Sequence, residues 1–193
     1  MRNSLLVLAF AMATAFSAQA QYTDIQINPI GALFGNLSAT AEFPVAETIG
    51  VEPSLALRLG STSLGGLTYK RSGFGAGVNG KFYFNPQDGH DRFYVGAYTR
   101  FSSTKNKVEE NDGSSSGGFA EEYTRTRLSL GVLVGHKWVA DNGLVFEIAV
   151  GGGRALLNNF DYEDGDDAFE DSLNALTQFD AYGRLSLGYR LGR

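Results

Sequence analysis

The side chains best suited to acid–base or nucleophilic chemistry in this chain are its two histidines, His90 and His136. His90 lies in a short polar turn and His136 lies just before another turn, so both are expected at the same end of the molecule. Nucleophilic catalysis needs a nucleophile and a base within hydrogen-bond reach of each other. Because both histidines are expected at this end, no such pair can be assigned at the opposite rim. We therefore predict interfacial histidines and no catalytic residue.

A second pattern, Gly75-x-Gly77-x-x-Gly80, has the letters of a dinucleotide-binding fingerprint. That motif needs a strand before it and a helix after it, because the helix N-terminus holds the phosphate. Here an alternating pattern runs on through Lys81 to Phe84 and into a turn, so no helix follows. Small residues facing a crowded interior explain these glycines better, and we predict no cofactor.

Carboxylates are concentrated in the segment 158–172, which contains seven Asp and Glu residues. Oxygen ligands at this density suit calcium, but their spacing does not fit an EF-hand loop. A run of like charges is more typical of a solvated loop. We therefore predict no specific metal site.

Alternation of apolar and polar residues dominates the rest of the chain. In the clearest example, Leu128, Leu130, Val132 and Val134 alternate with Arg, Ser and Gly residues. Successive side chains of a strand point to opposite faces, so one face of each such strand is apolar and the other is polar. The segments are long enough to cross a bilayer at a tilt, which needs about 9–11 residues.

We predict eight strands, at 22–29, 32–43, 49–60, 72–84, 92–103, 123–137, 144–156 and 178–191. Their connections alternate in length, with short ones at 44–48, 85–91 and 139–143 and long ones at 60–71, 103–122 and 157–177. Short turns on one rim and long loops on the other are typical of outer-membrane barrels, with the short turns in the periplasm. The predicted fold is therefore all-β, an eight-stranded antiparallel up-and-down transmembrane β-barrel.

The polar faces of these strands carry charges of both signs, which a barrel would turn inward: Glu42, Glu52, Arg58, Lys81, Arg100, Arg127, Lys137, Glu147, Asp180 and Arg184. An ion path is one interpretation. However, an eight-stranded barrel is only wide enough for its own side chains, and buried charges must pair. Lys81 and Glu52 are expected at similar heights on neighbouring strands. The pattern therefore favours a salt-bridged plug.

The first 20 residues have the pattern of a secretory signal peptide. Arg2 precedes a short apolar run, and Ala18-Gln19-Ala20 is an A-x-A cleavage site. The apolar run is shorter than the roughly 20 residues of a transmembrane helix. We predict a signal peptide at 1–20 and one barrel domain at 21–193. The net charge of -5 argues against nucleic acid as a partner.

Aromatic residues lie near the predicted strand ends, as in the girdles of membrane barrels. They are Phe43, Phe84, Phe93, Trp138, Phe146 and Tyr189 near the short-turn rim, and Phe74 and Phe101 near the other. With Asn28-Pro29-Ile30-Gly31 near the start and Leu185-Ser186-Leu187-Gly188-Tyr189 at the end, the chain resembles the small outer-membrane barrels of the OmpA/OmpX-like superfamily. It is similar in particular to the porin-family β-barrel domain proteins of Bacteroidota. The resemblance implies a fold and an outer-membrane location, with no agreed chemistry.

These observations predict a non-enzymatic integral outer-membrane barrel with an envelope-structural or surface-interaction role through long extracellular loops. Two alternatives stay open: a lipid-modifying outer-membrane enzyme, and a soluble lipocalin-like carrier, which would need its apolar face inside. The expected partners are outer-membrane lipid, lipopolysaccharide and the barrel assembly machinery, with the protein itself a monomer. The acidic segment 158–172 would form loose cation bridges to lipopolysaccharide phosphates. The sequence names no surface partner.

Overall fold

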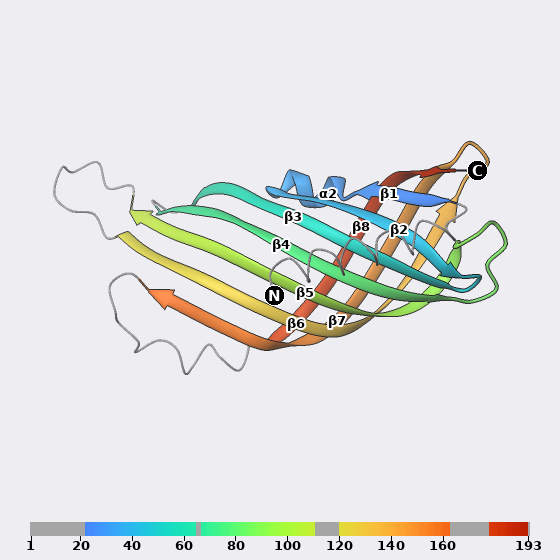
Figure 1. The fold of residues 1–193 in the computed structure, drawn as a ribbon. Coiled ribbons are helices and arrows are strands. Elements are labelled where there is room, and N and C mark those ends of the chain that lie inside the picture. Colours follow the sequence, from blue (N-terminus) through green and yellow to red (C-terminus); the bar gives the residue numbers. More distant parts are fainter. Residues whose placement is uncertain (1–21, 65–66, 111–119, 163–177, 193) are drawn as a thin grey trace, which may run out of the picture.

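A computed structural model describes residues 22–64, 67–110, 120–162 and 178–192. The signal peptide predicted at 1–20 lies outside these residues. Eight strands form one closed barrel (Figure 1): β1 (Thr23–Ile27), β2 (Asn36–Ala46), β3 (Ile49–Leu64), β4 (Leu67–Tyr83), β5 (Arg92–Glu110), β6 (Ala120–Val139), β7 (Leu144–Tyr162) and β8 (Phe179–Leu191). Each strand pairs antiparallel with its neighbour in sequence, and β1 pairs with β8 to close the ring. The predicted fold is confirmed.

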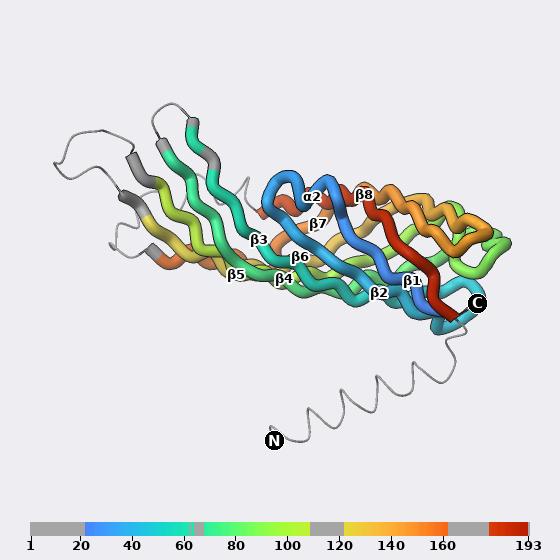
Figure 2. Tube along the Cα trace, turned by 90° about the horizontal axis from the view of Figure 1, so that it is seen from above, coloured from blue at the N-terminus to red at the C-terminus, as the bar shows by residue number. Residues whose placement is uncertain are grey.

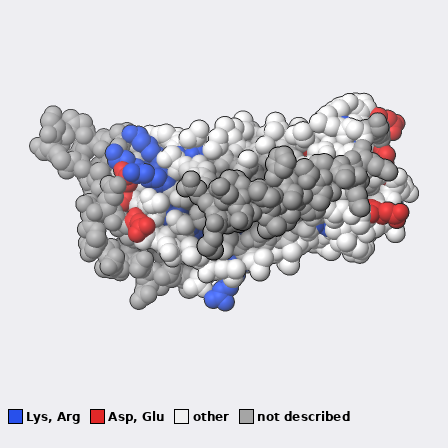
Figure 3. Space-filling view, in the orientation of Figure 1, with Lys and Arg blue, Asp and Glu red and all other residues white. Residues whose placement is uncertain are grey.

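The outer face of the barrel is apolar and the inner face is polar, as the alternation predicts. On β6, Val132 is 68% exposed and Val134 42%, whereas Leu133 between them and Ser129 earlier on the strand are buried. The described middle of the surface in Figure 3 is almost free of charged groups, which gather toward the two ends. A soluble carrier would have the opposite arrangement, so the lipocalin-like alternative is wrong.

Tight turns and the chain's C-terminus share one end of the barrel, here called the short-turn end (Figure 1, right). Asp141-Asn142-Gly143, within the predicted short connection 139–143, forms one of these turns, with Gly143 at a φ of 87° that favours glycine. The opposite, long-strand end differs from the prediction. Most residues of the expected loops 60–71 and 103–122 belong to strands, because β3, β4, β5 and β6 continue to pair there.

The first hairpin also differs from the prediction. Strand β1 stops at Ile27, and a one-turn helix, α2 (Pro29–Leu33), replaces the end of the predicted strand 22–29 and the start of 32–43. Asn28 caps this helix, its side chain accepting a hydrogen bond from Gly31 N over 2.8 Å, and Pro29 has the fixed φ that suits a first helical turn. Among the described residues, no helix is both long and apolar enough to cross a membrane.

The wall of the barrel is uneven in height. The strands β3 to β7 have 16 to 20 residues, whereas β1, β2 and β8 have 5, 11 and 13. Crossing a bilayer needs only about 9–11 residues per strand. The longer strands therefore extend as a protruding sheet past the short hairpin of β1, α2 and β2, which Figure 2 shows from above.

Candidate functional site

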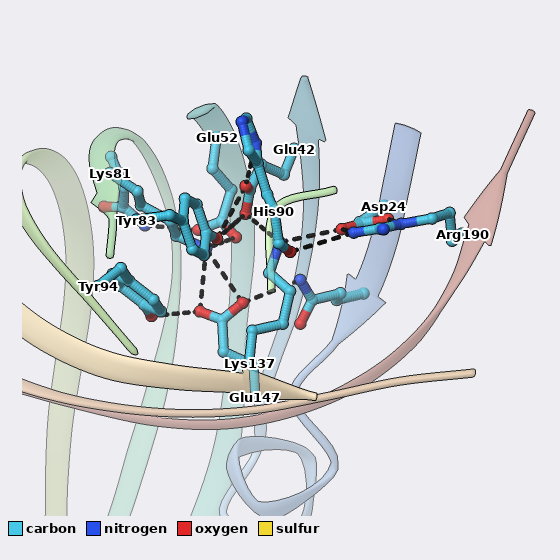
Figure 4. A network of polar contacts seen from close by, with 12 residues as sticks. Asp24, Glu42, Glu52, Lys81, Tyr83, His90, Tyr94, Lys137, Glu147 and Arg190 are labelled. Carbon is cyan, nitrogen blue, oxygen red and sulfur yellow. Dashed lines mark hydrogen bonds and ion pairs between the residues drawn. The ribbon is translucent and has the colours of Figure 1, made fainter. Parts of the chain in front are cut away.

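Lys81 lies at the centre of a buried ionic cluster near the short-turn end (Figure 4). Its Nζ atom donates to carboxylates of Glu42 at 2.7 Å, Glu52 at 2.7 Å and Glu147 at 2.9 Å. These residues come from strands β2, β3, β4 and β7, and all four are buried. The predicted neighbourhood of Lys81 and Glu52 is confirmed.

Four more charged residues complete this cluster, which we call the plug. Lys137 bonds Asp24 at 2.9 Å and Glu42 at 2.6 Å. Arg190 holds both carboxylate oxygens of Asp24, at 2.6 and 2.8 Å, and Arg184 bridges Glu52 and Glu147. The plug thus contains four carboxylates and four cations, Asp24, Glu42, Glu52 and Glu147 against Lys81, Lys137, Arg184 and Arg190. Its charges balance, so this buried part of the interior contains no uncompensated charge.

Glu42, Glu52 and Glu147 have carboxylate oxygens within 4.8 Å of one another, which is the spacing of a metal site. The ammonium group of Lys81 already bonds all three. It occupies the position at which a cation would bind. The arrangement is therefore that of an internal ion cluster.

Tyrosines and a glycine fit around the plug. Tyr83 donates to Glu42 over 2.8 Å and Tyr94 donates to Glu147 over 2.5 Å. Gly50 faces the same space, and a Cβ atom there would lie only 2.5 Å from a Glu42 oxygen. The glycine therefore provides room that the carboxylate occupies.

His90 is not the interfacial residue that the sequence predicts. It is fully buried and stacks on Tyr83 with ring centroids 4.8 Å apart. Its two ring nitrogens lie 3.2 Å from a Glu42 oxygen and 2.8 Å from the carbonyl oxygen of Ala46. The turn 85–91 folds back over the barrel mouth, which the local sequence does not reveal. His90 thereby closes the plug at the short-turn end.

Tyr22 seals the same mouth from the other side. Its hydroxyl accepts a hydrogen bond from His90 N over 2.6 Å, and the guanidinium of Arg190 lies 4.0 Å from its ring centroid. Burial raises the pKa of the Tyr22 hydroxyl to about 12, and the hydrogen bond from His90 only partly offsets this. Tyr22 precedes β1 and lies outside the membrane-spanning strands.

A cavity lies above the plug, toward the long-strand end. We call it the arginine vestibule. It has a volume of about 490 Å³, and the arginines that line it are Arg58, Arg71, Arg100, Arg125 and Arg127. Asp180 is the one carboxylate among the described lining residues. The sequence assigned Arg58, Arg100 and Arg127 to a salt-bridged plug, but the structure shows that the plug fills only the lower lumen.

The floor of the vestibule is an aromatic and ionic layer. Tyr98 donates to Asp180 over 2.8 Å, and its ring lies 5.0 Å from that of Tyr182. Tyr182 in turn accepts a hydrogen bond from Asn79 over 3.3 Å, and Asn79 donates to Glu52 of the plug over 2.6 Å. This layer separates the vestibule from the plug.

The remaining sequence candidates are dispersed. Gly75 and Gly77 face inward as predicted, but Gly80 faces outward with open space at its Cβ position, so the crowded-interior explanation is wrong for it. His136 lies on the outer face, its ring 4.1 Å from Trp138, as expected of an interfacial histidine. Most of the acidic segment 158–172 lies outside the described residues.

Several residues of the site were missed by sequence reasoning. Asp24 and Arg190 share the inward phase of their strands, which alternation could have revealed. Arg125 likewise lies two residues before the inward Arg127. Arg71 had no such signal, because it was expected in a loop.

The upper part of β3 forms a free edge of the protruding sheet. Strand β2 pairs with β3 no higher than Asn36 and Arg58, and Leu59 N donates to Gly35 O over 2.7 Å. Above this point, residues 60–64 pair with β4 alone within the described part of the chain. Their outer backbone groups face away from the sheet.

No protein-family model matches this chain, and no curated protein matches it. Among solved structures, the chain is similar to a major outer membrane protein from Thermus thermophilus, with a TM-score of 0.57 and 13% identity over 88% of this chain and 98% of that chain. Ail, the attachment invasion locus protein of Yersinia pestis, gives a TM-score of 0.48 at 9% identity over 88% and 98% of the two chains. Neisserial surface protein A gives 0.44 at 12% over 89% and 95%. The Thermus similarity shows the fold alone, and with the apolar outer face it makes this protein a membrane-spanning barrel of the outer-membrane type.

Proposed function

We propose that the protein is a non-conducting, non-enzymatic outer-membrane barrel that presents its protruding sheet at the cell surface for contact with a partner. One observation carries this proposal: the long strands β3 to β7 rise well beyond a bilayer, above a lumen that the plug seals. A transport pore needs a continuous path, and a mere membrane anchor needs no sheet beyond the lipid. An extracellular contact surface accounts for both features.

The free edge of β3 gives this surface a mode of recognition. Residues 60–64 present backbone N–H and C=O groups with no neighbouring strand among the described residues. Such an edge accepts an extended segment of another protein as an added strand. The proposed partner therefore contributes an extended peptide segment.

The positions of the histidines support the non-enzymatic part of the proposal. His90 is enclosed in the plug, and His136 lies against Trp138 on the outer face. Neither has a serine nucleophile among its hydrogen-bond partners in the described residues. Modification of a lipid would require such a pair at the rim.

The proposal extends to the expected partners. The apolar outer face would contact outer-membrane lipid and lipopolysaccharide, the C-terminal strand with Tyr189 and Leu191 would be recognised by the barrel assembly machinery, and the barrel would act as a monomer. Kinship with the porin-family proteins of Bacteroidota is part of the same proposal.

Single-cysteine labelling tests the orientation, because the natural chain has no cysteine. Ser61→Cys on the exposed part of β3 should react with a membrane-impermeant maleimide in intact cells. Ala140→Cys in a short turn should react only after the outer membrane is permeabilised. The reverse pattern would overturn the proposal.

A planar bilayer experiment tests the sealed lumen. The refolded protein should give no stable conductance, because the plug fills the lower lumen and so blocks the path through the barrel. A steady channel in the wild-type protein would contradict the non-conducting function. Lys81→Met serves as a comparison, because it leaves three carboxylates without their shared cation and should loosen the seal.

A further inference from the structure

We propose that the arginine vestibule binds a small tetrahedral oxyanion, specifically the phosphate group of a small phosphorylated solute. The vestibule is distinct from the edge of β3, and the proposal does not depend on the surface role. It is carried by the charge, geometry and volume of this cavity.

The charge of the vestibule is strongly unbalanced. Five arginines line it, from strands β3, β4, β5 and β6, against the single described carboxylate of Asp180. Asp180 is already bonded by Arg100 at 2.6 Å and approached by Arg127 at 3.4 Å. The plug below is balanced four to four, and the whole chain has a net charge of -5. The described residues that line the vestibule therefore carry an excess of positive charge that the plug and the chain as a whole do not.

Two of the vestibule arginines also bond uncharged oxygens, which add no negative charge to the cavity. Arg58 donates to the Thr104 hydroxyl over 2.9 Å, and Arg127 donates to the carbonyl oxygen of Phe179 over 2.7 Å. The Nε atom of Arg127 is buried with no hydrogen-bond partner. A buried donor without a partner is costly, so the guanidinium of Arg127 is not fully satisfied by its described neighbours.

The geometry suits phosphate. Guanidinium groups form paired hydrogen bonds with phosphate oxygens, and walls of low dielectric strengthen the attraction. A volume of about 490 Å³ exceeds that of a bare ion and lies in the range of small-molecule sites. The rings of Tyr123 and Phe179 line the same cavity and offer an apolar surface to the organic part of the solute. The closed floor at Tyr98 makes this a binding site with no exit through the barrel.

Titration calorimetry on the refolded full-length barrel in detergent micelles tests the proposal. The probes are inorganic phosphate, sulfate and glucose 6-phosphate, each at constant ionic strength set with sodium chloride. We expect saturable binding of one anion per barrel, weakening as the chloride concentration rises. Similar affinities for phosphate and sulfate with tighter binding of glucose 6-phosphate would support a site for phosphate esters. No saturable binding of any probe, or a preference for sulfate over both phosphates, would overturn it.

Matched variants locate the site. Arg58→Gln combined with Arg71→Gln removes two vestibule charges without touching the ion pairs of Asp180, and should weaken phosphate binding by at least tenfold. Arg154→Gln removes an exposed arginine from the outer face of β7 and should leave the affinity unchanged. Folding of each variant is checked by its resistance to unfolding on unheated gels. Equal affinities of the double variant and wild type, or an equal loss in Arg154→Gln, would contradict the assignment.

Discussion

Lys81 is the residue on which the lower lumen most depends, because its ammonium group bonds three carboxylates at once. Replacing Lys81 by Met should lower the free energy of unfolding by about 3–5 kcal/mol, since it leaves buried charges uncompensated. Urea unfolding in lipid vesicles, followed by the fluorescence of the single tryptophan, Trp138, measures the change. Lys70→Met on the exposed sheet is the control and should cost less than about 1 kcal/mol, because interactions of exposed charges contribute little to stability. Equal midpoints for both variants would contradict the role of Lys81.

Tyr22 predicts a dependence of stability on alkaline pH. Its pKa is about 12 in the folded barrel and close to 10.0 when exposed, so the folded state holds the proton more tightly. Its contribution to stability is therefore complete below pH 10 and is lost as the pH rises through 12. Between these values, the wild-type unfolding midpoint should fall more steeply than that of Tyr22→Phe. Parallel curves for the two proteins would show that Tyr22 does not titrate in this way.

The alternating sequence predicted which charged residues face the lumen but, apart from the neighbourhood of Lys81 and Glu52, not how they pair. The phase of a strand places Glu42, Lys81 and Glu147 inside, and this much follows from the two-residue period. Contacts between them run across the lumen between strands distant in sequence, so they depend on barrel diameter and register. The sequence misplaced His90 for a related reason. The turn 85–91 folds over the mouth of the barrel, and residue periodicity does not show how a turn folds.

At the scale of the strands, the membrane-spanning parts were predictable and the protruding parts were not. On β5 the outward positions change from Phe101 to Ser103, Lys105 and Lys107, so the apolar alternation ends there. The strand nevertheless continues, since its backbone groups are paired on both sides. A strand with water on both faces has no hydrophobic period, and it therefore reads as a loop.

The outer face of β6 gives a direct test of the membrane-spanning arrangement. Val132 lies near the middle of the stretch between Leu128 and Trp138, facing outward. A charge at the bilayer midplane costs about 2–4 kcal/mol for Lys or Arg and somewhat less for Asp. Val132→Asp should therefore reduce assembly into lipid vesicles, as measured by the folded fraction on unheated gels.

The matched control is Ser129→Asp on the same strand. Ser129 faces inward opposite Arg100, two residues from Arg127, so a carboxylate there would meet positive charge. We expect a much smaller effect on assembly. A larger loss at Ser129 than at Val132 would reverse the assignment of the two faces.

At the scale of the whole molecule, the uneven height of the wall determines what is accessible. The plug and vestibule share one barrel but are closed off from each other by the layer of Tyr98 and Tyr182. The lower half provides stability through balanced charge, and the upper half remains hollow and basic. An inward charge pattern of mixed sign did not reveal this division, because the relative heights of charges on distant strands depend on the register and tilt of the closed barrel.

The seam between β1 and β8 has a consequence for the order of folding. Only five residue pairs close the ring there. Across this seam, the guanidinium of Arg190 donates to the carboxylate of Asp24, which lies 166 positions earlier in the sequence. Contacts between such distant positions require a large loop to close first, so they form after the local hairpins.

An interaction that forms after the rate-limiting barrier affects the unfolding rate and leaves the folding rate unchanged. Arg190→Gln should therefore accelerate unfolding roughly tenfold or more, since bonds to a charged group contribute about 1.5–3 kcal/mol. Stopped-flow kinetics in micelles would measure both rates, and a slower folding rate with unchanged unfolding would mean that the chain's two ends meet early.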